Sequence, residues 1–473
     1  MTTLRALRPG FFVWLLGLTL LQAADRKPNF LFVYTDDQRW DAMGVVQREQ
    51  GERARFPWFK TPHMDRLAAE GLRFRNAFVT LALCAPSRAV FLTGRYNHLN
   101  GVANNRTPFP ESSVTHATLL RAAGYTTAYV GKWHMGSQSG QRPGFDYSAS
   151  FVGQGRYNNC PVEINGVSTP TTGWIDDVLT GYAIDFIRQH RERPFSLVVG
   201  FKTPHGPRGG ENLPARLRTL YADEASRPVP NLAVRAIYSG PGATAAKGAA
   251  VTPAHLDYFR HIAGADENLG RLLGALDEQG LTADTVLIYA SDNGYYLGEH
   301  GLGDKRSLYE ESLRIPLLVR YPRLVAAGSV RDEMVLNLDL APTLLELAGA
   351  TVPREMQGVS WVPLLAGQKS AWRQSFLAEY FQETNYPGTP TIVGVRTVDA
   401  KLVKYPGHPE WTEVFDLTLD PYELKNLAGD PASAARLTAE FDAQVQATGY
   451  RIPDYADKPG EAAPQKKGKK KQK

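Results

Sequence analysis

The stretch Asn29-Phe30-Leu31-Phe32-Val33-Tyr34-Thr35, followed at once by Asp36-Asp37, decides the fold. A short run rich in aromatic and aliphatic side chains is typical of a strand that is buried on both faces of a parallel sheet. We expect further strands of this kind at residues 127–130, 195–201, 285–290 and 315–319. Polar, reactive residues follow each of the first four runs directly.

Helical patterns separate these strands. Thr61-Pro62 opens one that Gly71 closes, and the others cover 175–189 and a long segment from Thr252-Pro253 towards Gly280. Strands that alternate with helices predict an α/β domain with a mostly parallel central sheet flanked by helices. Beyond Leu365 the pattern changes, and we expect a smaller α+β domain with short antiparallel strands at 391–397 and 400–405 and a last helix at 432–447.

The domain organisation follows from the length and the two termini. Arg5 and Arg8 precede an apolar run, 11–21, which has the length of an export-signal core and is too short to span a bilayer. We therefore expect an exported protein, periplasmic or extracellular, without stable membrane insertion after cleavage; a retained anchor is the alternative. The expected segments are a signal peptide (1–24), a main domain (25–368), a C-terminal subdomain (369–455) and a disordered Lys-rich tail (456–473).

The net charge of +5 does not describe the main part of the chain. Six lysines lie in the stretch 466–473, and without them the balance is slightly negative. Because only the tail is basic, and because it has no aromatic residues, we do not expect nucleic-acid binding. The tail is interpreted as a solvated segment, with loose attraction to an anionic glycan or cell surface as the alternative.

The stretch Cys84-Ala85-Pro86-Ser87-Arg88 predicts the start of a helix, because Pro86 suits the first turn and Gly94 suits the end. Unpaired backbone N–H groups and the helix dipole favour an anion there, and Arg88 adds a positive charge. Cys160 is the second of the two cysteines, and a disulfide between them is the alternative for an exported protein. The residues that flank Cys84 favour a reactive role.

The strand ends bring oxygen ligands together, since ligands bind beyond the carboxyl ends of the strands in open α/β sheets. These ligands are hard donors that suit Ca²⁺ or Mg²⁺ better than zinc: Asp36, Asp37, Asp292 and Asn293. Three crowded carboxylates repel one another unless a divalent cation compensates. Calcium tolerates irregular geometry better than magnesium, so the sequence predicts one Ca²⁺ ion.

These motifs resemble those of type I sulfatases, members of the alkaline-phosphatase superfamily, over nearly the whole chain. The stretches that carry the resemblance are 84–88 with 93–95, 36–37, 131–134, 291–294 and 303–311. The resemblance implies an alkaline-phosphatase-like fold with a small C-terminal domain. It also implies that a formylglycine-generating maturation enzyme oxidises Cys84, that the hydrated aldehyde is the nucleophile and a ligand of the metal, and that Cys160 is a spare thiol.

The resemblance further implies roles for the remaining site residues in hydrolysis of a sulfate ester. Arg88, Lys132 and Lys305 would neutralise the sulfate oxygens. His205 would protonate the departing alcohol, and His134 would accept the proton of the second hydroxyl of the nucleophile.

The substrate is interpreted from stretches similar to carbohydrate sulfatases, including N-acetylglucosamine-6-sulfatases, at 143–146, 153–157 and 165–166. A sulfated glycan, first a 6-O-sulfated N-acetylglucosamine, is the implied substrate. Aromatic and imidazole side chains either stack on the sugar or pack the small domain: Trp174, Tyr386, His408 and Trp411. Two other functions stay open: a formylglycine-dependent phosphonate or phosphate ester hydrolase, and a non-catalytic binder of sulfated glycans if Cys84 is unmodified.

Overall fold

A large mixed sheet forms the centre of the protein. The computed structural model describes residues 27–239 and 253–458, and ten of their strands hydrogen-bond in the order β11-β2-β10-β9-β1-β8-β4-β5-β6-β7. The middle of this sheet is parallel and consists of β9 (Thr285–Ser291), β1 (Asn29–Thr35), β8 (Phe195–Gly200), β4 (Thr126–Lys132) and β5 (Tyr147–Phe151). The predicted α/β class with a mostly parallel sheet is confirmed.

Shorter strands complete the two sides of the sheet. On one side, β10 (Leu317–Arg320) runs antiparallel to β9 and is followed by β2 (Leu72–Phe74) and β11 (Ser329–Arg331). The strand expected at 315–319 therefore exists, but its expected parallel direction was wrong. On the other side, β6 (Val162–Ile164) and β7 (Val167–Thr169) form an antiparallel extension. A separate two-stranded pair consists of β3 (Ala77–Phe78) and β12 (Val335–Leu336).

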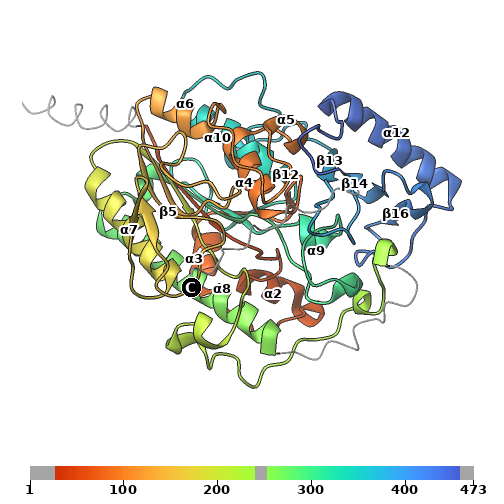
Figure 1. Cartoon of the computed structure of the whole chain (residues 1–473), viewed down its shortest axis with the longest axis horizontal. Helices are drawn as coiled ribbons and strands as arrows, with labels where there is room; N and C mark the ends of the chain where they lie inside the picture. Colours follow the sequence, from red (N-terminus) through yellow and green to blue (C-terminus); the bar gives the residue numbers. More distant parts are fainter. Residues whose placement is uncertain (1–26, 240–252, 459–473) are drawn as a thin grey trace, which may run out of the picture.

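Helices cover both faces of the sheet (Figure 1). One face carries α4 (Cys84–Thr93), α6 (His116–Ala122) and α10 (Leu340–Leu347), and the other carries α3 (Pro62–Glu70), α7 (Ile175–His190) and α8 (Pro253–Glu278). Alternate side chains of β1 enter two separate cores, because successive residues of a strand point to opposite faces. Phe30, Phe32 and Tyr34 pack on the α4 side, and Leu31 and Val33 pack on the α8 side. The continuous apolar run follows from this double burial.

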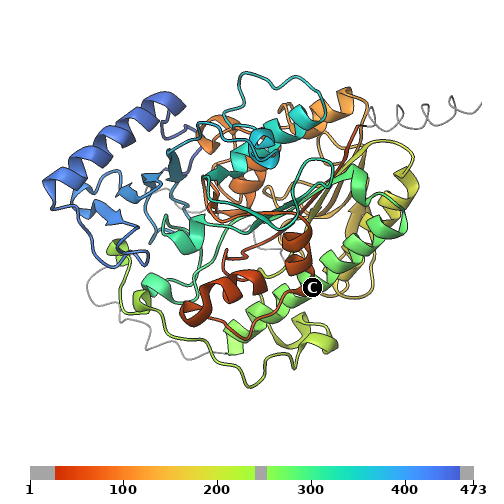
Figure 2. The ribbon, with the colours of Figure 1, turned by 180° about the vertical axis from the view of Figure 1, so that it is seen from behind.

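The C-terminal subdomain is an antiparallel sheet of four strands, β13 (Ser375–Tyr380), β14 (Ile392–Thr397), β15 (Ala400–Lys404) and β16 (Glu413–Asp416), in that order. The last helix, α12 (Pro431–Thr448), packs on one face of this sheet, and Figure 2 shows it on the outside of the molecule. The opposite side joins the main core, where the rings of Phe78 and Phe376 lie 5.3 Å apart. Four short helices complete the α-helices of the described residues: α2 (Gly44–Gln50), α5 (Asn97–Asn100), α9 (Glu310–Leu313) and α11 (Val362–Leu365).

Several expectations concern the termini and the cysteines. The signal peptide and all but the first three residues of the tail lie outside the described residues. Two of them belong to the packed body, since Ala456 is buried and Asp457 accepts hydrogen bonds from the backbone N–H of Thr384 at 2.7 Å and from Asn104 at 3.1 Å. Across the two described ranges, no helix has the length and apolar character needed to cross a membrane. Both cysteines are free thiols, so the alternative of a disulfide between them is wrong.

Candidate active site

Cys84 is the first residue of α4, as the sequence predicts. The helix ends at Gly94, whose left-handed conformation (φ 61°) lets its N–H donate to the carbonyl of Val90. At the other end, the side chain of Asn105 accepts a hydrogen bond from the backbone N–H of Ala85 at 2.9 Å. The Cys84 side chain is fully buried. The start of α4 is therefore held in place from outside the helix, and the side chain of Cys84 points into the protein.

The oxygen ligands meet because β1 and β9 are neighbouring parallel strands. Thr35 pairs with Ser291 at their carboxyl ends, so the residues that follow lie side by side. The backbone N–H of Asp37 donates to Asp292 at 3.1 Å, and the carboxylates of Asp36, Asp37 and Asp292 offer oxygens that all lie within 4.8 Å of one another. The sheet register therefore assembles three carboxylates that are distant in the chain.

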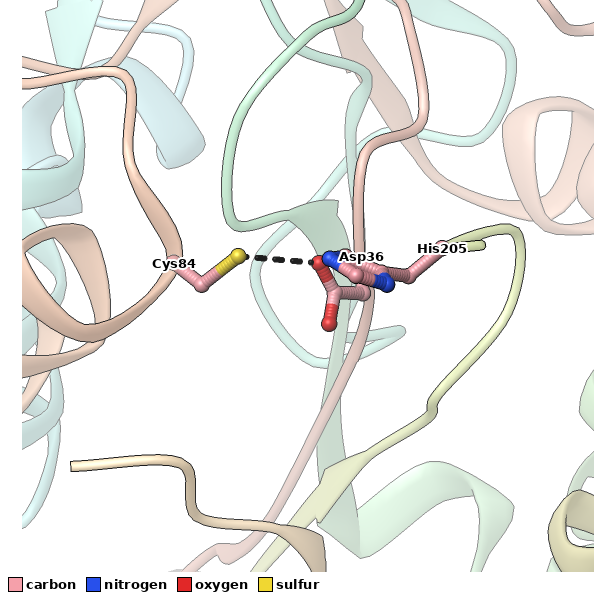
Figure 3. A group of neighbouring side chains, drawn as sticks. All are labelled: Asp36, Cys84 and His205. Carbon is pink, nitrogen blue, oxygen red and sulfur yellow. Dashed lines mark hydrogen bonds between the residues drawn. The ribbon is translucent and has the colours of Figure 1, made fainter. Parts of the chain in front are cut away.

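The residues present fit a hard divalent cation. The Sγ atom of Cys84 lies 3.2 Å from Oδ1 of Asp36 (Figure 3). Asn293 donates through Nδ2 to Asp37 at 2.7 Å, while its Oδ1 is buried without a hydrogen-bond partner. An unpaired amide oxygen beside three carboxylates is the environment that Ca²⁺ or Mg²⁺ requires. Burial, and next the charge of Asp36, raise the pKa of Asp292 to about 7, so a cation at this place would favour its charged form.

Three cationic side chains surround the carboxylates. Arg88 donates to Oδ2 of Asp292 through Nε at 2.9 Å and Nη2 at 2.8 Å. Lys132, at the end of β4, pairs with Asp36, and the Nζ of Lys305 lies 2.7 Å from Oδ1 of Asp37. The charges of the three carboxylates and the three positive side chains cancel, so a bound divalent metal ion would give the site a net positive charge. A site with this charge favours an anionic substrate.

The two predicted histidines lie beside this cluster. His134 has a positive φ of 53°, and its buried Nδ1 has no hydrogen-bond partner. His205 donates from Nδ1 to the carbonyl of Gly206 at 2.8 Å, which leaves Nε2 facing the site, 4.0 Å from Asp37. Burial, and next the charge of Lys132, lower the pKa of both imidazoles well below the usual value, so both are neutral at pH 7. Figure 3 shows Cys84, Asp36 and His205 converging from three segments.

The unmodified thiol of Cys84 is a poor nucleophile in this position. Burial, and next the charge of Asp36, raise its pKa above the usual value for cysteine. Because the thiolate is the reactive form of cysteine, the thiol stays protonated and unreactive at neutral pH. The buried, charged site therefore does not use Cys84 as an ordinary cysteine nucleophile.

Sequence reasoning missed the residues that support His205. Tyr157 donates from its hydroxyl to the carbonyl of His205 at 2.5 Å. Lys202 is fully buried, and its Nζ lies 3.3 Å from the same Gly206 carbonyl that His205 uses. Arg208 follows on the same loop. For Lys202 and Arg208, the only available signal was their position after the third strand, whereas Tyr157 lies in the stretch 153–157 that resembles carbohydrate sulfatases.

The proposed aromatic rim is only partly available. Trp174 is buried and stacks on Tyr157, so its place in a sugar-stacking rim was wrong and it packs the core instead. Tyr386 is exposed and lies 3.5 Å from the guanidinium of Arg306, the residue after Lys305. His408 and Trp411 stack on each other at 3.8 Å. Tyr386 is thus the rim candidate with a direct link to the site.

Comparison with known proteins defines the class. The family model Sulfatase matches residues 28–350, and the model N-sulphoglucosamine sulphohydrolase, C-terminal, matches 298–449. The chain is 31% identical to the N-acetylglucosamine-6-O-sulfatase of Bacteroides thetaiotaomicron, covering 85% of this chain and 83% of that protein. It is 28% identical to the Ulvan-active sulfatase of Formosa agariphila, covering 93% of this chain and 86% of that protein. The chain therefore belongs to the sulfatase family and is a sulfuric ester hydrolase.

Solved structures agree with this assignment. A structure determined in complex with its substrate, D-glucosamine-2-N,6-O-disulfate, superposes with a TM-score of 0.82 and 29% identity, covering 91% of this chain and 99% of that one. The phosphonate monoester hydrolase of Agrobacterium radiobacter superposes with a TM-score of 0.72 at 21% identity, covering 89% and 95%, and shares the fold. The resemblance to type I sulfatases of the carbohydrate branch is confirmed, as is the alkaline-phosphatase-like fold.

Proposed function

We propose that this sulfatase removes sulfate from an O-sulfated carbohydrate, with a formylglycine formed from Cys84 as its nucleophile. The observation that carries the proposal is the 3.2 Å contact between Cys84 and Asp36 inside a ring of three cations. The relatives named as N-acetylglucosamine-6-sulfatases support a 6-O-sulfated N-acetylglucosamine as the first substrate to test.

The proposed cofactor is one Ca²⁺ ion. Asp36, Asp37, Asp292, Asn293 and the modified Cys84 would hold it, since they offer oxygen ligands within reach of one another. When bound, the ion supplies positive charge that offsets the three carboxylates and the developing charge of the reaction. The buried, unpartnered Oδ1 of Asn293 supports an oxygen-binding cation at this place.

The proposed work of the chain's own residues follows from their contacts. Arg88, Lys132 and Lys305 surround the place where a sulfate approaches residue 84, and their charges stabilise the oxygens of the transition state. His205 holds its Nδ1–H on the Gly206 carbonyl, so the neutral ring has a free lone pair on Nε2. That nitrogen takes up the proton that the attacking hydroxyl of residue 84 loses, and then gives it to the departing alcohol. His134 is neutral and has an unpartnered Nδ1, so it suits the role of base towards the second hydroxyl of the hydrated aldehyde.

Export to the periplasm or the extracellular space remains part of the proposal. It is supported by the charged and apolar pattern at the N-terminus. It also agrees with a glycan as substrate, since such polymers are met outside the cell membrane. The maturation enzyme that oxidises Cys84 is the one protein partner that the proposal requires.

The first experiment is the mass of the tryptic peptide 76–88 from protein made in its native host. A formylglycine mass at position 84 supports the nucleophile, and a free thiol contradicts it. The second experiment measures sulfate release from N-acetylglucosamine-6-sulfate, with Cys84→Ala as the control. Comparing 4-nitrophenyl sulfate with 4-nitrophenyl phosphate separates a sulfatase from a phosphate ester hydrolase. Glycan retention without sulfate release identifies a binder.

A further inference from the structure

The loop that carries His205 also carries an arginine, Arg208, with one guanidinium nitrogen that has no partner. Arg208 donates from Nε to the carbonyl of Pro204 at 2.5 Å, and its Nη2 is buried without a hydrogen-bond partner. Within the described part of the chain, Arg208 forms no ion pair. The arginine of the sulfate-binding cluster differs, because Arg88 bonds to Asp292 through two nitrogens. Burying an unpaired charge is costly, so a site that does so is suited to an opposite charge brought by a ligand.

Arg208 lies next to the catalytic cluster. Its guanidinium lies 4.9 Å from the ring of Tyr258 and 4.4 Å from the ring of Tyr295. Tyr258 donates to the backbone carbonyl of Asp37 at 2.7 Å, and Tyr295 follows Asn293 by two residues. Burial lowers the pKa of Arg208, but the neighbouring Tyr295 and Asp37 raise it by more, so the guanidinium stays charged. The two tyrosine rings hold the guanidinium beside the site.

The side on which the sugar leaves the site indicates which part of the substrate Arg208 contacts. His205 protonates the departing alcohol in the proposed reaction, so the sugar leaves on the side of the His205 loop. Arg208 is three residues further along that loop, and its side chain is partly exposed. A guanidinium fork binds carboxylate and sulfate oxygens through paired hydrogen bonds, which a neutral hydroxyl does not match.

We propose that Arg208 binds a second anionic group, a carboxylate or another sulfate, on the sugar that carries the sulfate ester. This inference rests on the proposed function and narrows its substrate class to glycans with at least two negative groups near the cleaved ester. The residue acts in binding the leaving group, and the cluster around Asp36 acts on the sulfate that is removed.

The test compares Arg208→Met with the unchanged enzyme on three glycan substrates. The monoanionic substrate is N-acetylglucosamine-6-sulfate, and the dianionic ones are glucosamine-2-N,6-O-disulfate and a 6-O-sulfated disaccharide with a uronate. We expect the ratio of kcat/KM, dianionic over monoanionic, to fall by roughly 10- to 100-fold for one dianionic substrate, mostly through KM. The substrate that responds distinguishes sulfate from carboxylate. An unchanged ratio for both overturns the proposal.

Control variants separate binding from packing. Arg216 is half-exposed and pairs with Asp177 and Glu267, so Arg216→Met should leave all ratios unchanged. Arg208→Lys keeps the charge without the fork and should give an intermediate ratio. Arg208→Met loses one hydrogen bond and two ring contacts but no ion pair, so its Tm should fall only slightly. A large fall in Tm with equal losses on all substrates would instead identify a packing role and overturn the proposal.

The same experiment distinguishes a failure of the proposed function from a failure of the anion site at Arg208. Turnover of 4-methylumbelliferyl sulfate reports the sulfate-ester chemistry without any sugar. If the unchanged, formylglycine-containing enzyme fails to cleave this ester and all three glycans, the proposed function itself is wrong. If it cleaves them with an unchanged Arg208→Met ratio, only the anion site is wrong.

Discussion

Replacing Cys84 with serine tests the proposed nucleophile most directly. Serine keeps one hydroxyl at the start of α4 but has no second hydroxyl on the same carbon. After sulfate transfer, the serine ester therefore has no easy route to release sulfate. We expect about one equivalent of alcohol per enzyme in the first turnover, followed by a steady rate lower by roughly 10³-fold, which corresponds to about 4 kcal/mol.

The structure indicates that this variant folds. The side chain of Cys84 is fully buried, and its Sγ lies 3.2 Å from Oδ1 of Asp36. A serine hydroxyl is similar in size and can donate to the same carboxylate. We therefore expect the free energy of unfolding to change by no more than about 1 kcal/mol. Loss of turnover with normal stability would then report chemistry.

Rapid mixing with 4-methylumbelliferyl sulfate measures the first turnover, and intact mass measures the sulfate retained on the chain. Cys160→Ser is the matched control, because Cys160 is also buried but its sulfur lies near the carbonyl of Pro161, 3.6 Å away, outside the carboxylate cluster. That variant should keep full turnover. Near-normal repeated turnover by Cys84→Ser would refute the reasoning, and so would an equal loss in both variants.

Three further predictions concern the metal, the interdomain contact and a buried histidine. Removing the metal with a chelator should abolish turnover and lower Tm, because Ca²⁺ at a hundredfold excess over its Kd stabilises the protein that binds it by about 2.7 kcal/mol. Adding calcium back should reverse both effects, whereas the Tm of the Asp292→Asn variant should not change on chelation. Arg373→Met should lower the free energy of unfolding by about 3 kcal/mol in denaturant titrations, because it removes the ion-pair partner of the buried Asp339, and an unchanged midpoint would contradict this. Burial lowers the pKa of His116 to about 4, and neither ring nitrogen has a hydrogen-bond partner. Because the unfolded chain binds this proton more readily, the free energy of unfolding should be highest above pH 6.5 and should fall by about 3 kcal/mol as the pH drops to 4. His116→Leu should remove that part of the pH dependence, and parallel curves for the two proteins would count against it.

The central strands were readable because both faces of the sheet are covered. Four of the five strands in the parallel middle have an apolar run, as at Asn29–Thr35, and the structure places them within a residue or two of the expected bounds. The fifth, β5, was not expected, because its sequence Tyr-Ser-Ala-Ser-Phe alternates with serines. β13 was missed, because it contains the polar Glu379. That carboxylate is buried by contacts that come from far along the chain, with Nδ1 of His98 at 2.7 Å and the backbone N–H of Asn97 at 2.8 Å. Local patterns do not reveal such partners.

The sequence by itself supplied the proposed chemical set: the Cys84 motif, four oxygen ligands, three cations and two histidines, most of them at a strand end or in the first turns of a helix, and Lys305 in a loop. Only the tertiary structure decided how they meet. The pairing of Thr35 with Ser291 puts Asp37 against Asp292, and the antiparallel direction of β10 is set by contacts outside its own residues. Tertiary structure also buried Trp174 and left Nη2 of Arg208 without a partner. Local patterns report which residues are apolar, polar or turn-forming, whereas the partner of a buried charge depends on segments that are distant in the chain.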